Sequence, residues 1–134
     1  CLVNDGWSTQ CFARETGARL TFFFAKPDYP VAFYGEGALI DPTTPEKFSE
    51  MADKQANEVL SKCEKLAVEG GVDCSCTSST SDIPYEAIID AAEKNGCDLI
   101  FMASHGRRGI SGLLLGSETQ KVLTHSTVPV LVYR

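Results

Sequence analysis

Residues 98–117 read DLIFMASHGRRGISGLLLGS, an apolar run followed by a loop in which glycine recurs every third or fourth residue. The run Asp98–Ala103 is almost continuously apolar, which is typical of a strand covered on both faces in a parallel sheet. Ser117 closes the stretch, and because Gln120 follows it at capping-box spacing, it has the form of a helix start. The stretch therefore predicts a strand, a glycine-rich loop and a helix in succession.

Two further segments have the same continuous apolar character. Arg19–Ala25 is rich in phenylalanine and Val128–Tyr133 in valine, so each is expected to form a buried strand. Val72–Thr77 is a weaker candidate for a strand, in which Cys74 and Cys76 would share one face.

Helices are expected between these strands. The longest runs from Pro45 to Glu69, with Thr44 as its cap and apolar residues at spacings of three and four. A second is expected to be capped by Asp82 and to end at Asn95, and a third to extend from Ser117 to Ser126. Because strand and helix alternate, the sequence predicts an α/β fold, with right-handed crossovers and helices on both faces of an open parallel sheet.

Two segments depart from this regular pattern. Residues 27–43 form a connection of seventeen residues, which is long for such a fold. Its aromatic side chains (Tyr29, Phe33 and Tyr34) are expected to pack on the domain; the alternative is that they cover a nucleotide or a partner. At the N-terminus, only the nine poorly periodic residues 8–16 lie between Cys1-Leu2-Val3 and the next strand, too few for a helix that crosses a sheet. With no initiator methionine, we expect residues to be missing near Asn4 and Trp7.

The composition excludes several classes of function. The chain has 134 residues, a net charge of −6 and a pI near 4.8, whereas a dedicated nucleic-acid binder carries a basic face. No apolar run approaches the ~20 residues that cross a bilayer, and no secretion signal opens the sequence. We expect one soluble, acidic, cytoplasmic domain over residues 1–134, with no nucleic-acid or membrane partner.

The six cysteines include no CxxC pair, and the only histidines are His105 and His125. A zinc site needs about four ligands in clustered spacing, so no metal site is expected. A disulfide framework belongs to small secreted chains without a core. The cysteines are therefore expected to be reduced and mostly buried thiols.

The glycine-rich loop has the physical character of an anion site. Its glycines would let backbone N–H groups approach phosphate oxygens, and the helix that begins at Ser117 adds its unpaired N–H groups and its dipole. Arg107 and Arg108 would add charge-assisted contacts. No lysine precedes Ser117, which argues against a Walker A loop. The alternative interpretation is a surface loop followed by a capped helix.

The segment from Met102 to Ser117, followed by Val128–Val132, closely resembles the universal stress protein family. The nucleotide-binding signature of that family is a glycine, two residues, a second glycine, nine residues, and then glycine with serine or threonine. Gly106 and the pair Gly116-Ser117 match this signature in position, whereas Ala103 replaces the first glycine. The resemblance covers most of the chain from Gly17 onward.

The resemblance implies a Rossmann-like sheet of the adenine nucleotide alpha hydrolase type, with five parallel strands in the order 3-2-1-4-5 and a ligand crevice between the first and fourth strands. It implies that ATP binds there, and because a triphosphate usually carries Mg²⁺, that ion is a candidate cofactor. The residues that would bind the nucleotide, through the adenosine for the first four and the phosphates for the others, are Asp5, Ala25, Met102, Ala103, Gly106, Arg107, Gly116, Ser117, Glu118 and Thr119.

The resemblance also implies a homodimer in which the edge strand Val128–Tyr133 pairs with its copy; the alternative is that the chain's own loop covers this edge. The expected role is in stress response, through nucleotide-linked changes of state or of partner. His105 has no acidic or thiol partner nearby in the sequence, so catalysis is not assigned to it. Two other functions stay open: a homodimeric adaptor of the same fold that binds no nucleotide, and a slow ATPase or phosphotransferase.

Overall fold

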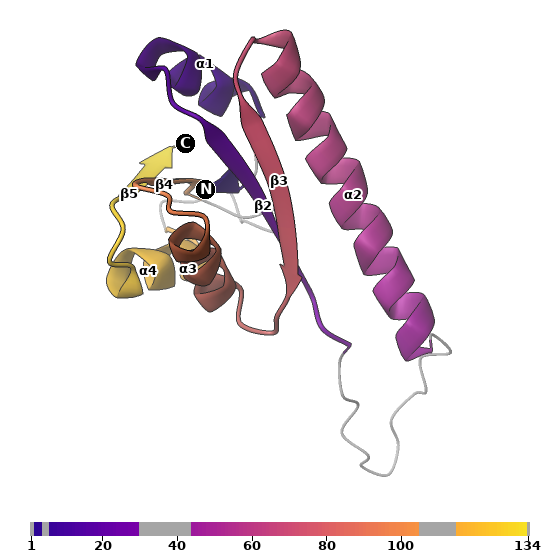
Figure 1. Ribbon diagram of the computed structural model, residues 1–134. Coiled ribbons are helices and arrows are strands. Elements are labelled where there is room, and N and C mark those ends of the chain that lie inside the picture. Colours follow the sequence, from indigo (N-terminus) through magenta and orange to yellow (C-terminus); the bar gives the residue numbers. More distant parts are fainter. Residues whose placement is uncertain (1, 4–5, 30–43, 105–114, 134) are drawn as a thin grey trace.

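The computed structural model describes residues 2–3, 6–29, 44–104 and 115–133. Strands and helices alternate along the chain (Figure 1). The order of the elements is β1 (Leu2–Val3), α1 (Gly6–Thr16), β2 (Leu20–Lys26), α2 (Pro45–Glu69), β3 (Cys74–Thr80), α3 (Pro84–Lys94), β4 (Ile100–Ala103), α4 (Ser117–His125) and β5 (Val130–Tyr133).

The strands form two parallel ladders that β1 joins, in the order β3-β2-β1-β4-β5. The β2–β3 ladder runs from the pair Leu20↔Cys74 to the pair Lys26↔Thr80. The β4–β5 ladder is shorter, and β1 connects the two because Leu2 pairs with both Phe22 and Phe101. The predicted α/β class and the parallel pairing of its strands are confirmed.

Apolar side chains point to both faces of the sheet, as the continuous apolar runs predict. On one face, Phe23 and Met102 pack in a core cluster with residues of α3 and α4. On the other, Phe22 and Phe101 pack with Ala13 of α1 and with residues of α2. Successive residues of a strand thus serve opposite cores, which explains why β2 and β4 show no alternation of polar and apolar residues.

The longest helix begins and ends where the sequence predicts. α2 spans Pro45–Glu69, and the hydroxyl of Thr44 accepts a hydrogen bond from the Lys47 N–H at 3.3 Å, as an N-cap residue does. No helix within the described ranges has both the length and the apolar character of a membrane span.

The predicted caps of the two shorter helices are wrong. The residue before α3 is Ile83, not Asp82, and Ser81 makes the turn instead by accepting the Ile83 N–H at 3.0 Å. Ser117 is not a cap but the first residue of α4, preceded by Gly116 in an extended conformation. In both cases the residue directly before the helix is not the one that the sequence pattern assigned as its cap, and it supplies no side-chain hydrogen bond.

The expectation that the N-terminal segment is too short for a helix is also wrong. α1 has eleven residues because it begins at Gly6, before the poorly periodic stretch, and it ends at Thr16. Ala13 is buried, and the ring of Phe12 stacks on that of Phe101 with centroids 5.6 Å apart. Asn4 lies outside the described residues, so the expectation of missing residues there stays a prediction.

Candidate functional site

The carboxyl ends of the parallel strands define one edge of the sheet, where ligands bind in open α/β folds. Ala25 lies next to the end of β2, Met102 and Ala103 end β4, and α4 begins at the same edge with Ser117. Glu118 and Thr119 follow in the first turn of α4. The structure therefore brings together part of the predicted site, while three of its residues lie outside the described ranges: Asp5, Gly106 and Arg107.

Hydrogen bonds fix the start of α4 against the end of β4. The Gly116 N–H donates to the Ser104 carbonyl oxygen at 2.8 Å, and the Ser104 N–H donates to the Tyr133 carbonyl oxygen at 2.8 Å. One turn further along, the Thr119 hydroxyl donates to the Ala103 carbonyl oxygen at 3.1 Å. The first turn of α4 is thus attached to the last residue of β4 and, through Ser104, to the end of β5.

This attachment presents the N-terminus of α4 at the predicted site. The first hydrogen bond of the helix runs from the Gln120 N–H to the Gly116 carbonyl oxygen, so the N–H groups of Ser117, Glu118 and Thr119 precede the helical ladder. Such groups, together with the helix dipole, favour an anion. Backbone donors at this position can hold phosphate oxygens without any catalytic side chain.

The carboxylate of Glu118 is engaged elsewhere. It accepts the Tyr85 N–H at 3.1 Å and the Lys121 ammonium at 2.8 Å, and its hydrogen bond raises the pKa of Lys121. Tyr85 lies in the first turn of α3, whose own preceding residue supplies no side-chain cap. Glu118 therefore caps α3 from the neighbouring helix, and what it offers a ligand is its backbone N–H.

A polar cluster extends from this contact over α3 and α4. The Lys121 ammonium lies 5.5 Å from the centroid of the Tyr85 ring, and the His125 ring lies 5.1 Å from it. The Tyr85 hydroxyl donates to Glu86 at 2.9 Å, which raises the pKa of the tyrosine. These side chains contact one another at an exposed surface and thereby join α3 and α4.

Two predicted adenosine contacts are restricted to the backbone. The Met102 side chain is 4% exposed and belongs to the core on the α3–α4 face. Ala25 is half-buried and packs against the same core. Either residue can meet a ligand at the carboxyl edge through its peptide groups, whereas its side chain stabilises the sheet.

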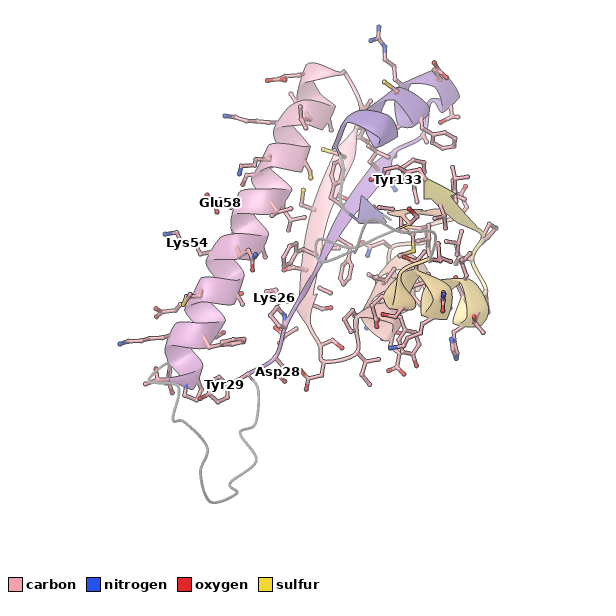
Figure 2. All side chains as sticks on the ribbon, turned by 180° about the vertical axis from the view of Figure 1, so that it is seen from behind. Lys26, Asp28, Tyr29, Lys54, Glu58 and Tyr133 are labelled. Atoms are coloured by element: carbon pink, nitrogen blue, oxygen red, sulfur yellow. The ribbon has the colours of Figure 1, made fainter. Side chains whose placement is uncertain are left out.

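At the end of β2, a second group of residues connects the sheet to α2 (Figure 2). The Lys26 ammonium contacts the Asp53 carboxylate at 2.6 Å, and the lysine side chain is only 19% exposed. The Tyr29 ring meets the Phe48 ring edge to face, with centroids 5.5 Å apart. The predicted packing of Tyr29 on the domain is confirmed, whereas Phe33 and Tyr34 lie outside the described residues. No local pattern indicated the ion pair, because its partners lie on different elements.

A hollow follows the outward face of α2 from Glu50 to Lys65. Every residue that lines it comes from that helix and charges of both signs occur there, with Lys54 and Glu58 pointing away from the strands (Figure 2). The prediction of a solvated face fits this surface, which lies away from the helix N-terminus of α4.

The prediction that the cysteines are mostly buried is wrong for those that the structure describes. Cys11 and Cys76 are exposed, and Cys63, Cys74 and Cys97 are half-buried. The cause for Cys74 and Cys76 is their place on β3, a strand at the end of the sheet order. Although Cys76 as a whole is exposed, its sulfur lies 3.8 Å from the Leu60 carbonyl oxygen, and desolvation of the thiol together with nearby Glu64 raises the pKa of Cys76 to about 11. Among the residues that the structure describes, no group of acidic, histidine and cysteine side chains has the geometry of a metal site.

A parallel α/β sheet with a helix N-terminus fixed at its carboxyl edge places the chain in the class of open α/β folds. The sequence matches the model of the universal stress protein family over residues 7–134. The chain belongs to that family.

Relatives and solved structures agree with this assignment. Universal stress protein MJ0531 of Methanocaldococcus jannaschii is 36% identical over 89 residues, which cover 66% of this chain and 52% of the relative. The chain thus spans about half the length of that curated relative. A crystal structure of a universal stress protein in complex with cAMP superposes with a TM-score of 0.64 at 21% identity, over 95% of this chain and 84% of the other.

A family member from Arabidopsis thaliana, solved with AMP bound, superposes with a TM-score of 0.61 at 18% identity, over 94% of this chain and 72% of the other. At these identities the superpositions establish the fold of the chain. The nucleotides belong to the neighbouring proteins.

Proposed function

We propose that this universal stress protein domain binds ATP at the carboxyl edge of its sheet, between β1 and β4. The proposal rests on one observation above the others: the N-terminus of α4 is attached to the end of β4 by hydrogen bonds from Gly116 and Thr119. The nucleotides bound by the neighbouring proteins, AMP and cAMP, support an adenine nucleotide as the ligand.

The residues at this edge fit a triphosphate. Three backbone N–H groups, those of Ser117, Glu118 and Thr119, precede the α4 ladder and face an anion in the way that helix N-termini do. The one carboxylate in this turn, Glu118, is paired with Lys121, which reduces its repulsion of phosphate. Gly106, Arg107 and Gly116 are proposed to complete the phosphate contacts, and Mg²⁺ to enter with the triphosphate.

On the adenosine side, the proposal assigns Asp5 to a direct contact and Ala25, Met102 and Ala103 to contacts through their backbones. Ala103 places a methyl group where the family signature has glycine. The half-buried position of Ala103 at the end of β4 leaves the residue within reach of a ligand at this edge.

The wider role follows from the family. We propose a cytoplasmic protein of the stress response whose state or partner changes with bound nucleotide, and which forms a homodimer through residues 128–133. β5 supports this interface because it ends the strand order and because Leu131 is 39% exposed. Glu118, the carboxylate in the first turn of α4, is engaged by two donors, so at most slow hydrolysis of ATP is proposed.

The test removes one backbone donor without disturbing the helix. Ser117 is the first residue of α4, where proline is tolerated, and Gly116 before it has φ −58° and ψ 144°, which a following proline allows. Ser117→Pro is expected to weaken ATP binding about tenfold, measured by calorimetry, because a charge-assisted N–H contact is lost.

Ser117→Ala is the matched control, since it removes the hydroxyl and keeps the N–H. Wild-type protein that binds no ATP at millimolar concentration would overturn the proposal and favour a nucleotide-free adaptor. The ratio of ATP to ADP in the bound fraction, followed over time, measures hydrolysis.

A further inference from the structure

Thr119, in the first turn of α4, uses its hydroxyl to contact another element of the fold. A threonine hydroxyl inside a helix commonly bonds the carbonyl four residues earlier, and Thr124 in the same helix does so, donating to the Gln120 carbonyl oxygen at 2.8 Å. Thr119 is only the third residue of α4, so the carbonyl four residues earlier, that of Leu115, precedes the helix, and the Gln120 side chain donates to it at 3.1 Å. The Thr119 hydroxyl reaches across to the last residue of β4.

The Thr119 side chain is also well enclosed. The residue is 3% exposed, and its hydroxyl lies 3.1 Å from the Ala103 carbonyl oxygen. A buried hydroxyl or carbonyl without a partner is costly, so this bond keeps both groups satisfied. The contact joins residues sixteen positions apart in the sequence and holds two separate elements together.

Two hydrogen bonds attach the start of α4 to the end of β4 and to the residue that follows it. The bond from the Gly116 N–H to the Ser104 carbonyl oxygen holds the chain just before α4 begins. Further along the helix, Val122 is buried in the core and Glu118 accepts the Tyr85 N–H, so α4 also packs against α3. The bond from Thr119 to Ala103, one turn into the helix, is the side-chain contact that ties this turn to the end of β4 and so bears on the direction of the N-terminal N–H groups.

We propose that Thr119 is a positioning residue of the nucleotide site. Through Ala103, its hydroxyl sets the angle at which the N–H groups of Ser117 and Glu118 face the phosphates. Its hydroxyl is committed to the protein and does not contact the ligand. This inference rests on the proposed function, since it concerns the same edge of the sheet.

The experiment compares three single substitutions. Thr119→Val replaces the hydroxyl with a methyl group of similar shape, whereas Thr119→Ser keeps the hydroxyl and removes the methyl group. Thr124→Val is the matched control, because it makes the same replacement at an exposed residue of the same helix whose hydroxyl donates within α4. Each variant is titrated with ATP and with adenosine by calorimetry.

Thr119→Val is expected to weaken ATP binding about tenfold and adenosine binding by a clearly smaller factor, because the phosphate-facing N–H groups are the ones that it redirects. Thr119→Ser and Thr124→Val are expected to bind ATP as the wild type does. A purely structural role would instead weaken ATP and adenosine equally, and that result would overturn the inference.

The result for the wild type separates the two proposals. If wild-type protein binds no ATP, the proposed function fails. If the wild type binds ATP and folded Thr119→Val binds it equally well, the function stands and the positioning role is wrong. Should the valine variant fail to fold, Thr119→Ala removes the same hydroxyl without placing a methyl group against the Ala103 carbonyl, and it is expected to show the same selective loss.

Discussion

The two ladders of the sheet differ in length and in what holds them. β2 and β3 are each seven residues long and are covered by α2, whereas β4 and β5 are each four residues long. The short ladder is extended at its carboxyl end by the hydrogen bonds of Ser104, Gly116 and Thr119. The long ladder thus packs against α2, while the short ladder gives the α4 N-terminus its position.

The largest expected effect comes from a substitution that leaves a cavity in the core beside the long ladder. Phe22 of β2 is 3% exposed and pairs with both β1 and β3. Phe22→Ala is expected to lower the free energy of unfolding by about 3–5 kcal/mol, because it removes a buried ring and leaves a cavity. Urea unfolding followed by circular dichroism measures the change. A loss below about 1 kcal/mol would contradict the close packing of Phe22 in this core.

A second experiment concerns the exposed edge of the long ladder. The pKa of the Cys76 thiol is raised from 9.0 to about 11, chiefly by partial burial. Since the thiolate is the reactive form, alkylation by iodoacetamide at pH 8 is expected to be about a hundredfold slower in the folded protein than in urea-unfolded protein. The rate should rise about tenfold per pH unit up to about pH 11.

Peptide mapping by mass spectrometry assigns the modified cysteine, and Cys76→Ser identifies its peptide. Equal rates in the folded and unfolded protein would show that β3 leaves this thiol in water. That outcome would contradict the partial covering of the Cys76 thiol at the edge of the long ladder.

The contact between Glu118 and Tyr85 tests how far the short ladder's helix supports its neighbour. Glu118→Ala removes the acceptor that caps α3 and is expected to lower stability by about 1–2 kcal/mol. Glu118→Gln keeps an acceptor oxygen and should lose less than half as much. Thermal unfolding of the two variants measures the difference, and equal losses would show that the hydrogen bond to the Tyr85 N–H contributes little.

The smallest expected effect belongs to the ion pair at the end of β2. Asp53→Asn leaves the largely covered Lys26 ammonium without its counter-charge, so stability is expected to fall by about 1 kcal/mol. Asp90→Asn is the control, because the Lys94–Asp90 pair is exposed on both sides, with 3.7 Å between its atoms. A loss for Asp53→Asn no larger than for the control would show that partial burial does not strengthen the pair.

Local signals explain which parts of the fold the sequence could predict. The limits of α2 follow from Thr44 and Pro45 at one end and from Gly70 at the other, all adjacent in the chain. β3 extends to Thr80, beyond the predicted end, because its polar residues pair with β2 by register and give no apolar pattern. A strand at the end of a sheet does not need one.

In the candidate site too, features within one segment were predictable and contacts between separate elements were not. The start of α4 at Ser117 was predictable because the glycine spacing and the helix start lie within one segment. The engagement of Glu118 with Tyr85 and of Thr119 with Ala103 was not, since these partners lie 33 and 16 residues apart. Such contacts exist only once the helices are packed on the sheet.

The measurement that tests the central claim most directly is a titration of ATP into isotope-labelled protein, followed by amide chemical shifts in NMR spectra. The account predicts saturable shifts at the amides of Ser117, Glu118 and Thr119, with little change at Ser78 of β3. Shifts confined to α2, or no shifts at millimolar ATP, would contradict the claim that the N-terminus of α4 holds the phosphates.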